Sequence, residues 1–195
     1  MKTPGILKLR PTQFVLGMKE VESKIDKIEK FSKKEWERYS HEHVVPVIFG
    51  WDREHYLIDH HHFIRACWET RREDYEIQIL KDLSHLSETA FWKEMMRNGW
   101  TYLHDQFGHG PHPPQALPMD IRCLADDPFR SLVWCVIDHG GIEKHKIPFF
   151  EFKWAEYFRK NMDCNLHSKS DFRDALNQAL QLASAKAASH LPGFK

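Results

Sequence analysis

The chain has 195 residues, of which 42% are hydrophobic and 29% charged. This composition is typical of a folded globular protein and argues against a disordered chain. The 28 Lys and Arg residues balance the 28 Asp and Glu residues, so overall basicity cannot drive nucleic-acid binding, although a local basic patch remains compatible with the composition.

The N-terminal segment predicts one short strand followed by two helices. We expect a strand over residues 6–9, and Arg10-Pro11 is expected to end it. From Gly17 the apolar residues recur at helical spacing, as Val21, Ile25 and Ile28. Ser32 and Glu35 have the spacing of a capping box, so a second helix is expected to begin there.

The next forty residues predict a small mixed sheet with a helix. Residues 44–49 are apolar and β-branched, as in a buried strand, and 55–58 form a second strand after the turn 50–52. Residues 63–69 are expected to be helical, and 75–80 alternate as a third strand of this group.

The remainder of the chain predicts mainly helices. They begin at Ser87, at Asp127-Pro128, at Pro148 and at Ser170, and a long loop covers residues 100–119. We therefore expect an α+β fold: a core over residues 1–85, with a small mixed β-sheet and packed helices. A mostly helical C-terminal extension, residues 86–195, is expected to pack on it in one structural unit.

The cellular context is predicted from what the chain lacks. None of the four cysteines, Cys67, Cys123, Cys135 and Cys164, stands in a Cys-x-x-Cys pair. No stretch approaches the roughly 20 apolar residues of a membrane span, and the first ten residues do not resemble a signal peptide. We expect a cytoplasmic protein that makes no membrane contact, and the sequence does not predict its oligomeric state.

The clearest candidate site is the strand-to-helix turn Asp59-His60-His61-His62. A helix N-terminus exposes backbone N–H groups and the positive end of the helix dipole, so it favours phosphate or another anion. Asp59 is placed to cap the helix or to fix the tautomer of one imidazole. Three adjacent histidines point in different directions, so one or two of them are expected to face a pocket.

A metal site is the competing interpretation of the same histidines. His60 and His62, together with His104, His109 or His112 from the long loop, have suitable side chains for a divalent metal. No His-Glu-x-x-His motif or clustered Asp pattern accompanies them. We therefore predict no metal ligand and keep this site as the alternative.

Several motifs together resemble the ParB/sulfiredoxin superfamily. The opening strand with Arg10-Pro11-Thr12-Gln13, the proline-containing strand at 45–48, the segment 56–59 and Arg65-Ala66 resemble its elements in order. The ParB-like nuclease subgroup is the most similar, through Ile58-Asp59-His60-His61-His62 and the segments 82–86, 91–92, 127–132 and 152–155. In this chain His60 stands at the place of the glycine of the partition proteins, and Phe63 at the place of their last arginine.

This resemblance implies a phosphate-binding turn and candidate catalytic groups. The phosphate ligands that it implies are Asp59, His60, His61, His62, Arg65 and Arg10, and Lys19 and Arg130 are further candidates. The implied catalytic residues are His61, His62 and a carboxylate from the first helix, Glu20 or Glu22. A nucleotide (ATP, ADP or CTP) with Mg²⁺ is the implied ligand, and nucleic acid is a weaker alternative.

Three functions are compatible with these features. The first is an enzyme acting on a phosphate ester, either a nuclease or a nucleotide-dependent phosphotransferase for a small molecule. The second is a non-enzymatic nucleotide- or DNA-binding module, and the third is a metal-binding or structural protein that uses the same histidines. We favour the first, because strand-to-helix turns rich in His suit proton transfer and phosphate binding.

Overall fold

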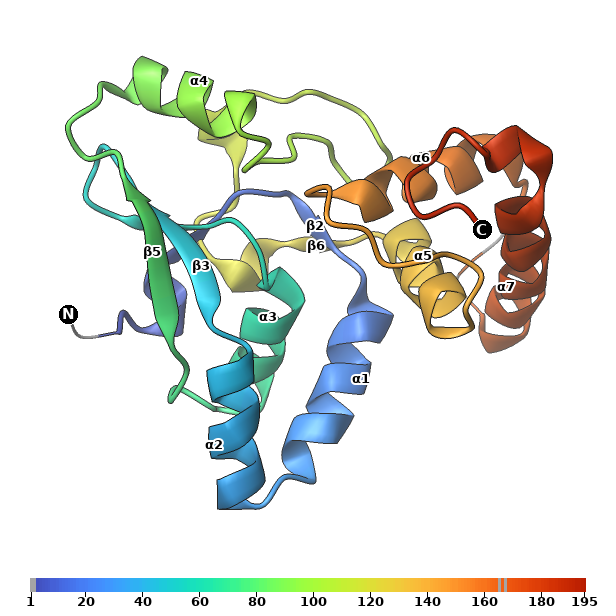
Figure 1. Cartoon of the computed structure of the whole chain (residues 1–195), viewed down its shortest axis with the longest axis horizontal. Coiled ribbons are helices and arrows are strands. Elements are labelled where there is room, and N and C mark those ends of the chain that lie inside the picture. Colours follow the sequence, from blue (N-terminus) through green and yellow to red (C-terminus); the bar gives the residue numbers. More distant parts are fainter. Residues whose placement is uncertain (1–2, 165, 167) are drawn as a thin grey trace. The chain divides into compact units, whose positions relative to one another are not determined.

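The computed structural model describes residues 3–164, 166 and 168–195, and it divides into two compact units (Figure 1). Unit 1 comprises Met1–Leu16 and Val21–Ala125, and unit 2 comprises Gly17–Glu20 and Asp126–Lys195. The boundary that we expected after residue 85 thus falls inside unit 1. The physical reason is that the helix following residue 87 contributes large side chains to the core of the sheet.

Unit 1 is built on a four-stranded mixed sheet with the order β1-β4-β3-β5. Its strands are β1 (Leu9–Pro11), β3 (Val45–Phe49), β4 (His55–Leu57) and β5 (Ile77–Asp82). β1 and β4 are parallel, β3 and β4 form the expected antiparallel hairpin, and β3 and β5 are parallel. The expected strand at 6–9 is wrong for its first three residues, which form a 3₁₀ turn (Ile6–Lys8) before β1 begins.

The α4 helix (Glu88–Arg97) packs on one side of this sheet. Phe91, Trp92 and Met95 of the helix join Ile48 and Tyr56 of the strands in one buried cluster. Ser87 caps the helix as expected, because its hydroxyl accepts the amide hydrogen of Ala90. Since side chains alternate along a strand, the neighbouring buried residues of β3 and β4 point to the other face.

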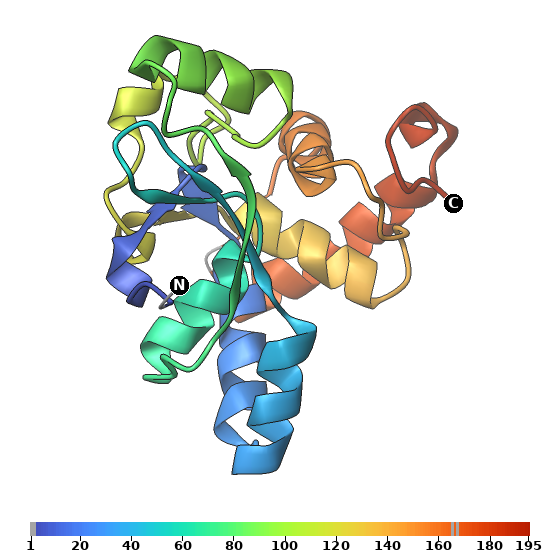
Figure 2. The same cartoon turned by 60° about the vertical axis from the view of Figure 1, so that its left-hand side comes forward.

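Three further helices complete the first half of the chain: α1 (Met18–Glu29), α2 (Lys33–Glu42) and α3 (His61–Glu69). α1 and α2 lie side by side (Figure 2), and Lys27 of α1 lies over the ring of Tyr39 in α2. The buried Trp36 of α2 stacks on Phe63 of α3, with 6.1 Å between their centroids. The predicted capping box of α2 is confirmed, with Ser32 and Glu35 bonded reciprocally.

The segment after α4 is mainly loop, as expected, with two short 3₁₀ turns, Pro114–Ala116 and Ile121–Cys123. Asp105 organises the loop, since its carboxylate accepts the amide hydrogens of Phe107 and His109 and contacts the His112 ring. The loop leads into β6 (Ala125–Asp126), which pairs with β2 (Val15–Leu16) in a separate two-stranded sheet.

Unit 2 is helical and has its own core. It contains α5 (Pro128–Asp138), α6 (Phe150–Asn161) and α7 (Lys169–Ser184), whose inward faces form a single buried cluster. Asp127 caps α5 and Pro128 opens it, as the sequence predicted. For α7 the predicted cap, Ser170, is wrong: the cap is Ser168, whose hydroxyl accepts the amide hydrogen of Asp171. No helix in the described part of the chain is long and apolar enough to cross a bilayer.

Candidate functional site

The predicted turn connects the end of β4 directly to the start of α3. The parallel neighbour β1 also ends here, because Pro11 lies opposite Leu57 in the register. The helix begins at His61, and its N-cap is His60, not Asp59 as one of our two expectations had it. The exposed Asp59 carboxylate instead accepts the amide hydrogen of His60 at 2.6 Å, and no side chain caps the helix.

His60 has a left-handed backbone conformation, with φ 63° and ψ 23°. This region favours glycine and costs most other residues roughly 1 kcal/mol. The turn therefore keeps the backbone that a glycine at this place would adopt, although the sequence departs from the partition-protein pattern here. The His60 ring lies edge-on to His43 and to Phe63, with centroids 5.9 and 6.2 Å away.

His61 is buried, with 3% of its surface exposed, between the ends of the two parallel strands. Its Nε2 atom accepts the amide hydrogen of Thr12 at 3.3 Å. Burial holds the pKa of His61 well below its usual value, and the neighbouring His62 and His60 lower it further, against a weaker opposing effect of a hydrogen bond with the Leu57 backbone. The ring is therefore neutral near pH 7, with its proton on Nδ1.

The position of His61 gives it a structural role in this fold. Thr12 is fully buried, and its hydroxyl donates to the Leu57 carbonyl at 2.7 Å. Together the two side chains fasten the end of β1 to the end of β4 and to the first turn of α3. His62 is also buried, with 8% exposed. The catalytic and phosphate-binding roles of His61 and His62 remain predictions.

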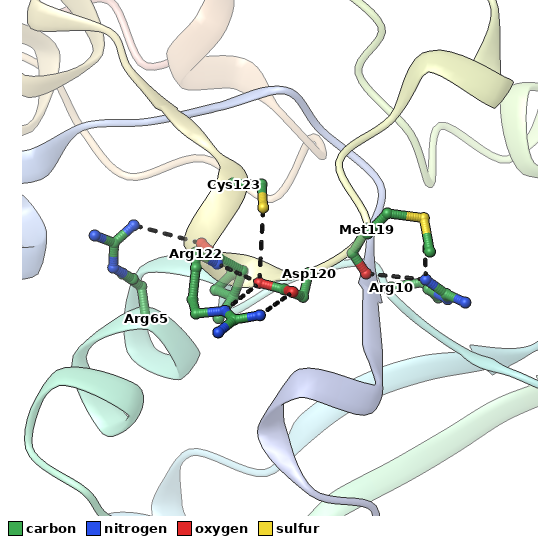
Figure 3. A network of polar contacts seen from close by, with 7 residues as sticks. Arg10, Arg65, Met119, Asp120, Arg122 and Cys123 are labelled. Atoms are coloured by element: carbon green, nitrogen blue, oxygen red, sulfur yellow. Dashed lines mark hydrogen bonds and ion pairs between the residues drawn. The ribbon is translucent and has the colours of Figure 1, made fainter.

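The predicted arginines Arg10 and Arg65 hold the segment that precedes β6 (Figure 3). Arg10 Nη1 donates to the Met119 carbonyl at 3.1 Å, and Arg65 Nη1 donates to the Ile121 carbonyl at 3.4 Å. Each also faces a carboxylate: Glu54 lies 4.0 Å from Arg10, and Glu69 lies 2.7 Å from Arg65. Both arginines thus have partners within unit 1, and their role as phosphate ligands stays a prediction.

Next to them, the turn at 120–123 is closed by its own side chains (Figure 3). The Asp120 carboxylate accepts two hydrogen bonds from the Arg122 guanidinium, at 3.0 and 2.9 Å, and one from the Arg122 amide. The Arg122 side chain, about half exposed, holds the pKa of Asp120 below its usual range. Cys123 Sγ lies 4.0 Å from the same carboxylate.

The predicted carboxylates of the first helix fall into different surroundings. Glu22 is exposed, whereas Glu20 belongs to unit 2 and lies 3.2 Å from Arg130 Nη2. The same nitrogen lies 3.3 Å from Glu151, which the sequence did not reveal as a partner. Arg130 is 5% exposed, and its guanidinium lies over the Phe152 ring. The buried Arg130 thus joins the carboxylates of Glu20 and Glu151 within unit 2.

The histidines of the alternative metal site lie in separate surroundings within the described part of the chain. The described residues contain no group of three or more His, Cys, Asp or Glu side chains that could hold a metal ion. His60 lies against aromatic rings, whereas His112 contacts Asp105 at 3.1 Å and lies edge-on to Phe14. The loop histidines therefore have local partners of their own.

Comparison with known proteins identifies relatives along nearly the whole chain. The family described as "Putative ParB-like nuclease" matches residues 3–160. The crystal structure of protein Atu1540 from Agrobacterium tumefaciens superposes with a TM-score of 0.89 at 37% sequence identity, over 98% of this chain and 95% of that one. None of the curated proteins matches significantly. The fold is thus a mixed α/β fold with a small mixed sheet, and the chain belongs to the ParB-like nuclease family.

Proposed function

We propose that this protein cleaves a phosphate ester, as a nuclease-type enzyme, with the phosphate bound at the N-terminus of α3. The observation that carries the proposal is the α3 start itself. It follows two parallel strand ends and has no side-chain cap, and its N-cap residue takes the left-handed backbone that favours glycine. Backbone amides at such a place bind anions without any charged side chain.

The neutral His61 fits this proposal as a positioning residue. Its contact with the Thr12 amide fixes the first turn of α3 against β1, so the amides keep one orientation. A helix start that is already rigid loses little entropy when an anion binds. The dipole of the helix supplies the favourable potential that the neutral ring does not.

Proton transfer requires a separate group, and His62, the buried residue that follows His61 in unit 1, is the candidate that we propose. A neutral imidazole or an ionised carboxylate can take the proton from an attacking water or hydroxyl. The catalytic role of Glu20, which pairs with Arg130 in unit 2, stays a prediction from the sequence. Glu22, which is exposed, remains a weaker candidate.

The test is turnover of simple phosphate esters by the purified protein. Bis(p-nitrophenyl) phosphate, single-stranded DNA and double-stranded DNA are offered with and without Mg²⁺, and ATP or CTP is offered with a small hydroxyl compound. Turnover of any phosphodiester supports the proposal. Absence of turnover on every substrate contradicts it, and thermal stabilisation by a nucleotide without turnover would indicate a binding module.

The amide geometry is tested by a pair of variants at residue 60. His60→Gly keeps the left-handed conformation, so the variant should remain active, whereas His60→Val disfavours it and should lose about 10²-fold in rate. Arg71 also has a positive φ, 56°, and is exposed, so Arg71→Val controls for backbone strain alone. Equal rates for the two His60 variants would contradict phosphate binding by these amides.

A further inference from the structure

A cavity of about 260 Å³ in unit 1 lies beside the β3–β4 hairpin and is separate from the histidine turn, whose residues do not line it. Three aromatic side chains line it: Trp51 from the hairpin turn, Tyr56 from β4 and Trp92 from α4. Trp51 is 36% exposed, so part of its indole ring is open to solvent. The cavity thus offers aromatic surface to a small ligand.

The central aromatic residue, Tyr56, is held in place by a hydrogen-bonded chain. The Tyr56 hydroxyl donates to Asp52 Oδ2 at 2.9 Å, and Asp52 Oδ1 accepts the amide hydrogen of Glu54 at 3.2 Å. Burial, with Asp52 as the next cause, raises the pKa of Tyr56 above its usual value, so the phenol stays neutral and keeps donating. The ring of Trp92 lies edge-on to Tyr56 with 5.4 Å between centroids, which fixes the opposite wall.

The charge lining the cavity is negative overall. Asp52 and Glu88 both line the cavity. Among the described residues, neither carboxylate forms an ion pair with a Lys, Arg or His side chain. Within the part of the chain that the structure describes, the Glu88 carboxylate accepts a side-chain hydrogen bond only from the neutral amide of Gln115, at 2.8 Å. Arg10 is the one cation among the lining residues, but Glu54 lies 4.0 Å from its guanidinium, and its Nη1 donates to a backbone carbonyl. The lining residues therefore include more carboxylates than cationic side chains.

We propose that this cavity binds a small organic cation of the quaternary ammonium class. Aromatic faces attract cations through the ring quadrupole, and the attraction is strongest for tryptophan. The two carboxylates add a favourable potential, and a quaternary ammonium group needs no hydrogen-bond acceptor from the apolar wall. The same carboxylates repel phosphate, so this site differs in ligand chemistry from the start of α3.

The first experiment compares choline with its uncharged isostere 3,3-dimethyl-1-butanol, by titration calorimetry on the full chain. Choline is expected to bind about 5- to 30-fold more tightly than the isostere, the range of one or two cation–π contacts. Equal affinity of the two compounds would overturn the proposal, because the cavity would then be only apolar. Absence of choline binding up to about 50 mM would also overturn it.

Variants then assign binding to this cavity. Trp51→Ala should weaken choline binding about 5- to 30-fold, and Trp51→Phe should restore most of the affinity. Phe107 is an exposed aromatic residue outside the cavity, so Phe107→Ala should leave the choline affinity unchanged. Glu88→Gln should weaken choline binding about three- to tenfold but leave binding of the isostere unchanged. Its control is Glu37→Gln, because Glu37 is an exposed residue of α2 outside the cavity. Unchanged choline affinity in both Trp51→Ala and Glu88→Gln would overturn the assignment.

Discussion

Buried His61 should make the stability of this protein depend on pH between pH 5 and 7. Its pKa in the folded state lies well below 6.5, mainly because the ring is buried. The unfolded chain therefore binds more protons in this interval, and the free energy of unfolding falls as the pH is lowered below 6.5. One such histidine contributes a slope of about 1.4 kcal/mol per pH unit, until the pH reaches the folded pKa.

The slope can be assigned to His61 by substitution with glutamine. Gln Oε1 can replace Nε2 as the acceptor for the Thr12 amide, so His61→Gln keeps the contact but does not titrate. The free energy of unfolding is measured by urea denaturation at several values between pH 5 and 7. His43 and His55 also have pKa values lowered by burial, and they should leave part of the slope in the variant.

His85→Gln is the matched control, because His85 is exposed. We expect wild type and His85→Gln to share one slope, and His61→Gln to lose about 1.4 kcal/mol per pH unit of it. If His61→Gln keeps the full wild-type slope, the ring is not buried in its neutral form, and the structural role that we assign to it is refuted.

Three further substitutions test contacts outside that ring. Arg130→Met leaves the half-buried carboxylates of Glu20 and Glu151 without their cation and should destabilise unit 2 by about 1–3 kcal/mol. Adding Glu151→Gln should recover part of this loss in thermal denaturation. Thr12→Val removes the donor to Leu57 and should cost about 1–3 kcal/mol in urea denaturation, and a cost near zero would contradict the bond. Ser32→Ala removes the cap of α2 and should cost about 1 kcal/mol, measured by circular dichroism melting, while an unchanged midpoint would contradict the capping role.

Local features of the fold were predictable where the chemistry lies within a few residues. The capping box at Ser32 and the Asp127-Pro128 helix start were predicted because each capping side chain and the backbone amide that donates to it lie within three residues of each other. The β3–β4 hairpin was predicted because apolar runs flank a short turn with Gly50. Two serines near 168–170 both suit an N-cap, and residue type alone does not distinguish them.

Domain organisation was less predictable because it depends on packing between distant segments. The α4 helix looked like the start of a helical extension, since its sequence is simply amphipathic. Its partners, Ile48 and Tyr56, lie on strands about forty residues earlier, and nothing in the helix sequence specifies them. The parallel pairing of β1 with β4 was equally hard to predict from local sequence, because it joins residues that are 46 positions apart, such as Arg10 and Tyr56.

At the histidine turn, the sequence pattern predicts the backbone but not the protonation or the contacts of the side chains. The strand, the turn and the helix follow from apolar pattern and spacing, so the backbone amides at the start of α3 could be anticipated. The state of each ring could not, because it is set by the ring's tertiary neighbours. The His61 ring meets an amide 49 residues away and is kept neutral by burial, whereas His60 bends the backbone as a glycine would. A phosphate at this turn would therefore interact mainly with the peptide backbone, and substituting single imidazoles by alanine would test packing as much as catalysis.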